Sequence, residues 1–278
     1  MSFLLAVSLL WALSFGLMPR VSPLGAPFVA AVRSLLALAL FLPMLRLRGL
    51  ALRSGLALAG IGALQLGLMY VLYTASFRWL RPSEVALFTI FTPILVALAE
   101  DLMAWRMDWR VLGVATLAVL GTGLALGARV RQQELQWGFL LVMASNACFA
   151  WGQILYRRLA RRLGRPDHHL MGLLYAGAAL ITLALAGPSH LAHPSGSQWL
   201  VLAYLGLVAS GLGFFLFNAG ARRVDVGTLA VFNNAKVPLA ILASALVFGE
   251  HVAVLRLLAG GGLIAMALAI NGGIRPRP

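Results

Sequence analysis

The sequence has few acidic residues, one cysteine and one lysine. Aspartate and glutamate together number 8 in 278 residues, and charged residues make up 11% of the chain, whereas soluble domains carry about 25%. This shortage excludes an ordinary soluble domain. Cys148 has no second cysteine to pair with, so a disulfide framework is also excluded.

Enzyme motifs are lacking as well. The sequence contains no HExxH, no GxSxG and no phosphate-cradling loop. The histidines lie in or beside predicted connectors without the spacing of metal ligands: His168, His169, His190, His193 and His251. We therefore expect no catalytic residue, no metal and no cofactor, with a membrane enzyme as an alternative class.

Long apolar runs dominate what is present. Hydrophobic residues make up 61% of the chain, and about 20 apolar residues suffice for one transmembrane helix. The runs predict an all-α integral membrane protein with ten transmembrane helices and only short connectors. The predicted helices are residues 2–19, 25–44, 55–77, 83–104, 109–127, 136–156, 168–187, 198–218, 226–248 and 252–271.

The positive charge is concentrated in the connectors. A net charge of +14 would suggest a nucleic-acid partner in a soluble chain, but here 14 arginines lie on the side of both termini and six on the opposite side. Short arginine-rich loops stay in the cytoplasm. We therefore predict cytoplasmic termini, with the lipid bilayer and no nucleic acid as partner. The two basic residues that remain, Arg33 and Lys236, lie deeper within predicted helices.

An internal repeat divides the chain into residues 1–130 and 131–278. The run "ALFTIFTPILVALAE" near Pro93 is echoed by "AVFNNAKVPLAILAS" near Pro238, and "LLWALSFG" by "CFAWGQIL". Five helices per half is an odd number, so the halves are predicted to insert with opposite orientation. Inverted repeats of this kind are typical of secondary transporters, which bind substrate between the halves near the midplane.

These motifs resemble a known family. The five-plus-five layout, the run "APFVAAVR", the sequence Pro238 to Gly249 and Glu250, and the glycine-rich last helix are similar to EamA-type members of the drug/metabolite transporter superfamily. The resemblance implies a ten-helix transporter of the bacterial inner membrane, in which predicted helices 1, 3, 4, 6, 8 and 9 line a central cavity. One departure is that Ala104 and Trp105 stand where the first half would carry the Gly-Glu pair.

Lys236 is the first candidate for a substrate-binding residue. A cation at the centre of a transmembrane helix costs about 2.5 to 3.5 kcal/mol on insertion scales, and such residues are functional by default. Asn233 lies three residues earlier, on the same helix face. Together they predict a patch that binds an anion. The alternative is a structural ion pair between helices.

Three further charged residues are ambiguous. Arg33, about two turns into the second predicted helix, is interpreted as a structural charge, either snorkelling or joining helices. Glu100 and Asp101 are interfacial if the fourth helix ends at Ala99, and lie within the span if it runs to Ala104. Within the span, such a carboxylate could carry a proton during transport.

Aromatic and amide side chains complete the predicted site. Trp11 and Trp151 lie at mid-span and recur in both halves, whereas Trp79, Trp105, Trp109, Trp137 and Trp199 lie near span ends, as belt residues do. The remaining candidates along cavity-type helices are Tyr70, Tyr73, Asn146, Gln153 and Asn218. Each could also simply join helices.

These residues predict a secondary transporter of small, partly apolar metabolites that carry a carboxylate. Amino acids and organic acids are the expected anionic or zwitterionic substrates, exported or exchanged by alternating access. A carrier of phosphorylated or nucleotide-linked metabolites and a multidrug exporter are the alternatives. A deep lysine would repel cationic drugs, and a single deep cation suits a single carboxylate better than a phosphate.

Overall fold

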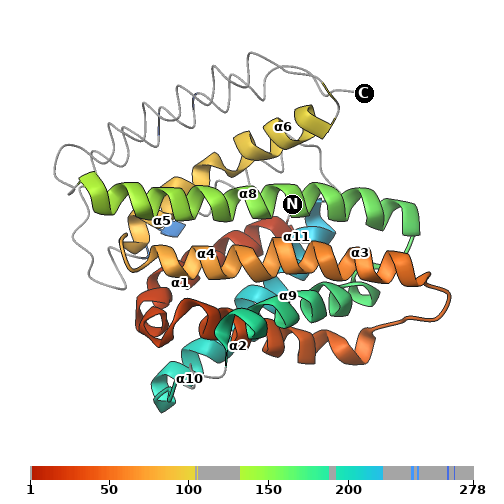
Figure 1. The fold of residues 1–278 in the computed structure, drawn as a ribbon, viewed down its shortest axis with the longest axis horizontal. Coiled ribbons are helices and arrows are strands. Elements are labelled where there is room, and N and C mark those ends of the chain that lie inside the picture. The colour runs from red at the N-terminus through yellow and green to blue at the C-terminus, as the bar shows by residue number, and fades with distance from the viewer. Residues whose placement is uncertain are drawn as a thin grey trace.

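The computed structural model describes residues 2–103, 105, 132–187 and 192–221, together with the isolated positions 239, 240, 243, 262 and 266. The regular structure of these residues is helical, with no strand among them. Six helices in the described ranges are long and apolar enough to cross a membrane, by length and composition. This part of the chain is an all-α bundle (Figure 1).

The first four predicted helices form in order along the chain, and the third and fourth are each one continuous helix of several segments. Their segments are α1 (Ser2–Val21), α2 (Ala26–Phe41), α3 (Leu52–Gly62), η3 (Ala63–Leu68), α4 (Met69–Ser76), α5 (Pro82–Phe88), η4 (Thr89–Phe91) and α6 (Thr92–Met103). Short 3-10 turns flank α2: η1 (Ser22–Leu24) and η2 (Leu42–Met44).

The described helices of the second half follow the same pattern, and the last of them is again continuous across three segments. The segments are α8 (Gln132–Leu163), η6 (Asp167–His169), α9 (Met171–Ala186), α10 (Gly196–Ala203), η7 (Tyr204–Leu212) and α11 (Gly213–Ala221).

Local sequence sets the start of two of these helices. Pro82 begins α5 at the position where its missing N–H costs nothing, and the Glu84 carboxylate accepts a hydrogen bond of 2.8 Å from the Arg81 backbone N–H. At the start of α10, Ser195 and Gln198 cap each other through bonds of 3.3 and 2.9 Å.

Seven of the ten predicted helices coincide with helices of the structure. The predictions for residues 109–127, 226–248 and 252–271 lie outside the described residues, apart from isolated positions. The largest difference is α8, which extends to Leu163 instead of ending at residue 156. Arginine is a good helix former, so the helix continues through Arg157–Arg162 after the apolar run has ended. The ten-helix inverted repeat stays a prediction.

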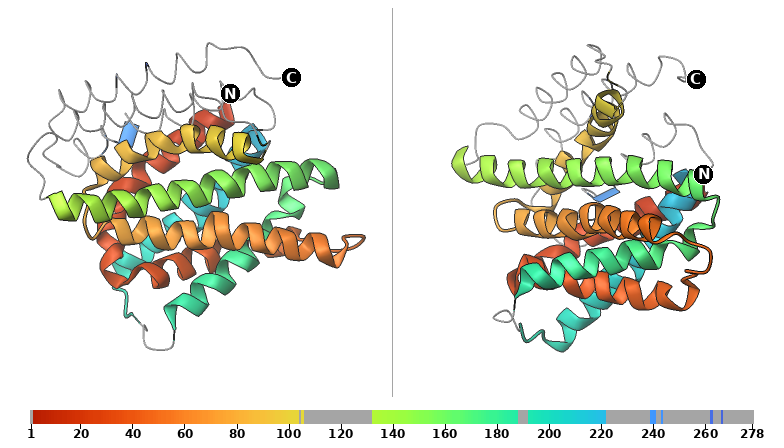
Figure 2. Two further views of the ribbon diagram at one scale, coloured as in Figure 1. Left: turned by 45° about the horizontal axis from the view of Figure 1, so that its top comes forward. Right: turned by 45° about the vertical axis from the view of Figure 1, so that its right-hand side comes forward.

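Helices of the two predicted halves lie beside one another. In the first half α2 packs against α9 and η7 of the second half, while α4 packs against α8 and α1 against α11. Figures 1 and 2 show the same interleaving: α8 runs alongside the continuous α3–α4 helix, and α9 lies next to α2. Any space enclosed at these contacts is therefore lined by residues from both halves of the sequence.

Glycine allows the closest of these approaches. A Cβ placed on Gly62 would lie 1.9 Å from the carbonyl oxygen of Leu174, and one placed on Gly177 would lie 1.8 Å from that of Ala59. Such distances are impossible for any other residue, so α3 and α9 touch backbone to backbone. Small residues have this role in many membrane helix pairs. Gly60, in contrast, has nothing within 4 Å of a Cβ.

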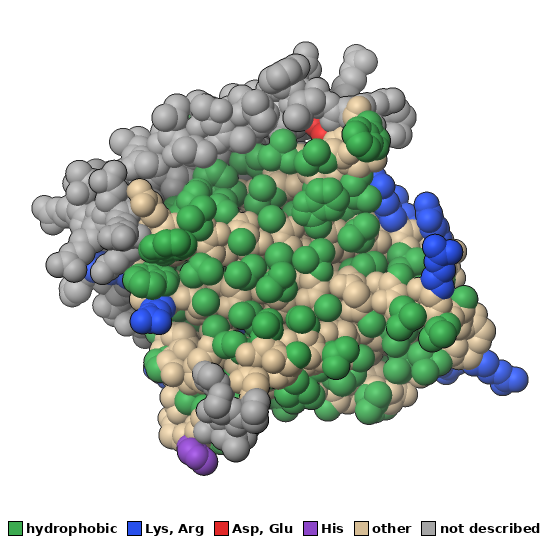
Figure 3. All heavy atoms as spheres, in the orientation of Figure 1, with side chains coloured by type: hydrophobic (Ala, Val, Ile, Leu, Met, Phe, Trp, Pro, Cys, Tyr) green, Lys and Arg blue, Asp and Glu red, His purple; other side chains and the backbone are tan. Residues whose placement is uncertain are grey.

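Many exposed side chains of the described helices are apolar, as expected where helices face lipid. Figure 3 shows hydrophobic side chains over the described part of this face, with arginine side chains gathered toward its two ends. Exposed leucines on the helices include Leu35, Leu56, Leu140, Leu180 and Leu200. Four of the tryptophans predicted for the membrane interface are exposed: Trp79, Trp105, Trp137 and Trp199. Trp109 lies outside the described residues.

Candidate functional site

A pocket lies between helices of the two predicted halves. The space between its lining side chains is about 540 Å³, a volume that includes open solvent. The lining belongs to α1, α2, α4, the η4–α6 region, α8 and α11. The described lining residues are Trp11, Ser14, Phe15, Arg33, Met69, Tyr70, Tyr73, Thr89, Thr92, Ser145, Asn146, Phe149 and Phe214.

Arg33 supplies a positive charge to this pocket. Its side chain is only 4% exposed. The guanidinium carbon lies 3.9 Å from the centroid of the Tyr70 ring, Nε donates to Ser210 Oγ at 3.2 Å, and Nη1 faces Met18 Sδ at 3.7 Å. These partners are neutral, and no carboxylate of the described residues forms an ion pair with Arg33. The charge is thus solvated by a ring, a hydroxyl and a sulfur.

The π-helical segment η7 positions several of these side chains. A π-helical turn displaces backbone carbonyls from the regular pairing of an α-helix, so they can accept other donors. Trp11 Nε1 donates to the carbonyl oxygen of Ala209 at 2.9 Å, and the Tyr175 hydroxyl donates to that of Ser210 at 2.8 Å. A Cβ on Gly213 would lie 2.8 Å from Trp11 Nε1, so glycine at that position makes room for the indole.

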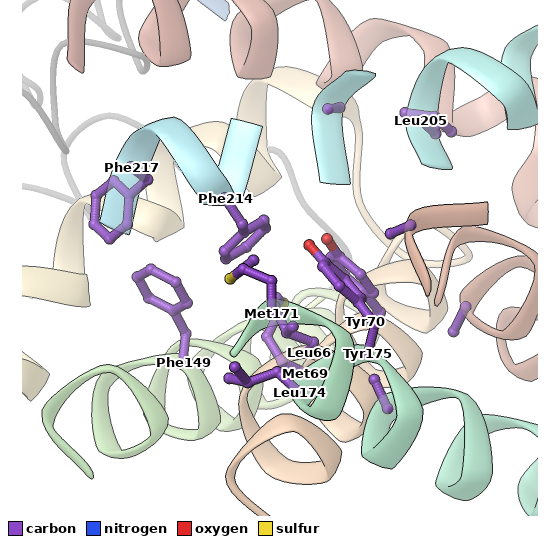
Figure 4. Packing of buried hydrophobic residues seen from close by; sticks show 14 of the residues in the cluster. Leu66, Met69, Tyr70, Phe149, Met171, Leu174, Tyr175, Leu205, Phe214 and Phe217 are labelled. Carbon is purple, nitrogen blue, oxygen red and sulfur yellow. The ribbon is translucent and has the colours of Figure 1, made fainter. Parts of the chain in front are cut away.

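Aromatic rings form the apolar wall of the pocket. The Trp11 ring centroid lies 5.0 Å from that of Phe214, and Phe149 lies 5.8 Å from Phe214 in an edge-to-face arrangement. Phe15 meets Tyr73 edge to face at 5.8 Å. Figure 4 shows Phe149 pointing toward Phe214 from another helix, and the hydroxyl ends of Tyr70 and Tyr175 side by side. Rings at these separations stabilise one another and hold a fixed surface.

Hydroxyl and amide groups form another part of the lining, and each donates to a backbone carbonyl oxygen. Thr89 Oγ1 donates to Ala86 at 2.8 Å, Thr92 Oγ1 to Thr89 at 2.7 Å, Ser145 Oγ to Met69 at 3.0 Å, and Asn146 Nδ2 to Phe88 at 2.9 Å. The bonds from Ser145 and Asn146 join α8 to α4 and α5. They fix the polar side chains in place before any ligand arrives.

The structure brings four of the predicted site residues together and separates others from them. Trp11, Tyr70, Tyr73 and Asn146 line the pocket. The others are not among its described lining residues: Trp151 is half-buried, Gln153 is buried, and Asn218 is buried and donates to Met171 Sδ at 3.5 Å. Lys236 and Asn233 lie outside the described residues.

The two acidic candidates lie in the last turn of α6. This helix runs to Met103, so the alternative in which it ends at Ala99 is wrong. Asp101 is 2% exposed and Glu100 is half-buried. Both carboxylates are distant in sequence from the α6 residue that lines the pocket, Thr92.

For Arg33, sequence analysis left two alternatives, snorkelling to the interface or joining helices. A snorkelling arginine would reach the interface, whereas this one is buried, joins α2 to η7 and lines the pocket. The side chain therefore joins helices, and no residue pattern indicated that it also faces a cavity. Ser14, Thr89, Thr92 and Phe149 were also missed, because small hydroxyls and phenylalanines are common on every face of a membrane helix.

Within the described ranges, no cluster of histidine, cysteine, aspartate or glutamate could hold a metal ion. A helical membrane bundle with a pocket lined from both halves is an architecture of membrane transporters. The EamA-like transporter family matches residues 1–127 and, a second time, residues 136–272. The chain therefore belongs to this family, which confirms the resemblance seen in the sequence motifs.

Individual relatives lie within the same family of transporters. The chain is 40% identical to a "Probable biotin transporter" of Pseudomonas aeruginosa, over 98% of this chain and 97% of that protein. It is 36% identical to the "Biotin transporter" of Escherichia coli K12, over 90% and 86%. It is 29% identical to the "Aromatic amino acid exporter YddG" of Ancylobacter novellus, over 71% of each chain.

A solved structure, named "Crystal structure of protein", has a TM-score of 0.66 with this chain and covers 96% of it and 95% of its own length. The sequence identity is 23%, so the likeness concerns the fold alone. It supports the helical arrangement described above.

Proposed function

We propose that this protein transports small, partly apolar carboxylates across the bacterial inner membrane by alternating access, and that biotin is the first candidate substrate. The relatives named as biotin transporters support this choice, since they cover nearly the whole chain. Biotin carries one carboxylate on an aliphatic chain and a compact ring system. It is therefore the kind of substrate expected from the sequence.

The observation that carries the proposal is the environment of Arg33. A buried cation is expensive inside a membrane protein and is normally matched by an opposite charge. Arg33 lines the pocket, and its partners among the described residues are neutral. A substrate carboxylate would supply the missing counter-charge, and the guanidinium fork can bind it through two parallel hydrogen bonds.

The rest of the pocket suits the apolar part of such a substrate. Trp11, Phe149 and Phe214 offer ring faces and edges for a compact ring and an aliphatic chain. Lys236 and Asn233 remain proposed binding residues. Ala240, four residues after Lys236 in the sequence, packs in the same cluster as the pocket residue Phe15.

Amino-acid export is the second candidate. The relative named as an aromatic amino acid exporter supports it, as do the aromatic rings of the pocket. Export or exchange remains the proposed direction for this candidate, with Trp151, Gln153 and Asn218 as further proposed contacts.

Ligand binding by the purified protein tests both candidates. We expect saturable binding of biotin, and weaker or no binding of phenylalanine, glucose 6-phosphate and tetraphenylphosphonium, which represent the rival classes. Arg33→Met should abolish biotin binding. Arg78→Met is the matched control, because Arg78 is exposed and lies 5.3 Å from the ring of Trp79. If biotin still binds to Arg33→Met but not to Lys236→Met, then Lys236 binds the carboxylate in place of Arg33.

Measurements of biotin uptake and efflux in proteoliposomes then determine the direction of transport. Biotin entering vesicles against its gradient would establish accumulation, and release only in exchange for external substrate would establish exchange. Tight binding of phenylalanine with none of biotin would replace the first candidate by the second.

A further inference from the structure

The polar groups of the pocket are sorted by hydrogen-bonding type. A hydroxyl group has one hydrogen to donate and two lone pairs that accept. Each of three hydroxyls donates its hydrogen bond to a backbone carbonyl oxygen, which can only accept: Thr89, Thr92 and Ser145. Ser14 does the same, donating to the carbonyl oxygen of Trp11 at 2.7 Å. Toward the pocket, these four hydroxyls can therefore only accept hydrogen bonds.

Asn146 extends the same surface. Its partner, the Phe88 carbonyl oxygen, can only accept, so the nitrogen of the side-chain amide must face Phe88. Oδ1 stays available as an acceptor, and one N–H remains. We call Thr89, Thr92, Ser145 and Asn146 the acceptor wall.

Besides the remaining N–H of Asn146, donors of the pocket come from other helices. Arg33 on α2 is a donor only, and the Tyr70 hydroxyl on α4 is buried without a hydrogen-bond partner in the described part of the chain. The acceptor wall belongs to η4, α6 and α8. A ligand that satisfies this pocket needs hydrogen-bond acceptors toward α2 and α4, and N–H or O–H donors toward η4, α6 and α8.

The charge of the lining decides which donor suits the acceptor wall. Arg33 is the charged side chain among the described lining residues, and none of them is acidic. An ammonium group would enter beside this cation without a counter-charge, which is costly where water is scarce. A neutral N–H group has no such cost, and it can still donate hydrogen bonds to the acceptor oxygens.

We propose that the acceptor wall binds neutral N–H groups, so that the pocket selects carboxylates that also carry a cyclic urea or a similar neutral N–H donor. The inference rests on the proposed function, because Arg33 must hold the carboxylate for the other end of the molecule to reach the wall. It predicts discrimination that the carboxylate and the apolar ring cannot provide alone.

Competition against labelled biotin by three probes tests this proposal. Lipoate has the same five-carbon acid chain on a sulfur ring but no N–H group, and desthiobiotin keeps the urea and the carboxylate but lacks the sulfur ring. We expect desthiobiotin to bind within about threefold of biotin and lipoate to bind about 10- to 100-fold more weakly, since unmatched buried polar groups cost about 1 to 3 kcal/mol. Biotinamide, which lacks the negative charge, should bind weakly because it cannot neutralise Arg33.

The outcomes separate the inference from the proposed function. If lipoate binds as tightly as biotin, the proposed recognition of N–H groups by the acceptor wall is wrong, whereas the proposed transport of carboxylates is not contradicted. Biotinamide binding as tightly as biotin would overturn the role of Arg33. An absence of binding by all carboxylate probes would overturn both.

A pair of isosteric variants gives a second test. Thr89→Val removes the hydroxyl oxygen from the wall and should weaken biotin about tenfold while leaving lipoate unchanged. Thr182→Val is the matched control: Thr182 is buried, donates to the Ala178 carbonyl oxygen at 2.8 Å, and is absent from the described lining. An equal loss for biotin and lipoate would assign Thr89 to packing. If Thr89→Val does not fold, Thr92→Val replaces it, with the same readout.

Discussion

The guanidinium of Arg33 lies 3.9 Å from the centroid of the Tyr70 ring, and both side chains are buried. A cation over an aromatic face is stabilised by the ring quadrupole, by about 2 kcal/mol or more once water is excluded. This contact holds a positive charge inside the bundle without neutralising it. It leaves Arg33 able to attract a carboxylate.

Replacing Tyr70 should therefore affect the position of Arg33. Tyr70→Leu removes the ring, and we expect the free energy of biotin binding to weaken by about 1 to 2 kcal/mol. Tyr70→Phe keeps the ring and removes only the hydroxyl, so it should lose less biotin affinity than Tyr70→Leu. Titration of both variants with labelled biotin checks the prediction, and equal losses would show that the hydroxyl matters instead of the ring.

The two mid-span tryptophans should behave differently. Trp11→Phe loses the hydrogen bond to Ala209, so we expect weaker biotin binding and a lower melting temperature, with a stability loss of about 1 kcal/mol. Trp151→Phe should leave biotin affinity unchanged, because Trp151 is not a described lining residue. Dissociation constants and thermal melts of both proteins provide the comparison. A larger binding loss for Trp151→Phe would restore it to the site.

Gly62 and Gly60 form a matched pair for helix packing. Gly62→Ala places a Cβ against the Leu174 backbone, and overpacking of this kind costs about 1 to 3 kcal/mol. Gly60→Ala meets no atom within 4 Å and should stabilise the helix by about 0.5 to 1 kcal/mol. The variants should thus shift the melting temperature in opposite directions. Shifts of the same sign would contradict the backbone contact between α3 and α9.

Asp101 and Glu100 are the candidates for proton coupling. If Asp101 carries a proton during transport, Asp101→Asn should remove the pH dependence of net flux and leave exchange of substrate between the two sides intact. Glu100→Gln tests the second candidate in the same way, at a carboxylate that is less buried. Loss of flux and exchange together would indicate a folding role, and retention of the full pH dependence would exclude Asp101 from coupling.

The topology can be checked by labelling. In a protein with Cys148→Ser, which removes the one native cysteine, a cysteine introduced at Gly164 should resist impermeant reagents added outside intact cells. Gly164 is exposed and lies among the arginines that predict a cytoplasmic connector. A cysteine at Pro23, on the opposite side, should react readily. The reverse pattern would invert the orientation of every helix.

Most of the helical layout could be predicted from the positions of the apolar runs along the chain. A span of about 20 apolar residues has few alternatives in a membrane, because backbone groups must be hydrogen-bonded within the segment. The end of α8 was predicted less well, since its last turns are polar and the apolar run gives no information there. The segments η3 and η7 could not be predicted, because a π-helical turn depends on packing and leaves no mark in hydropathy.

The amino-acid sequence was sufficient to identify a multi-pass helical membrane protein of the EamA-like transporter family, and it placed Arg33 and Lys236 deep within predicted helices. Apolar length and a repeated motif suffice for that, because both are properties of the chain read in order. The packing of the helices was needed to show that Arg33 contacts Tyr70 and Ser210 and lines the pocket, and that the hydroxyls of Thr89 and Ser145 donate to backbone carbonyl oxygens. Arg33 and Ser145 contact residues far away in the sequence, whereas Thr89 donates to the carbonyl oxygen three residues earlier. The hydroxyls of Ser145 and Thr89 are left as acceptors because their hydrogens already have partners.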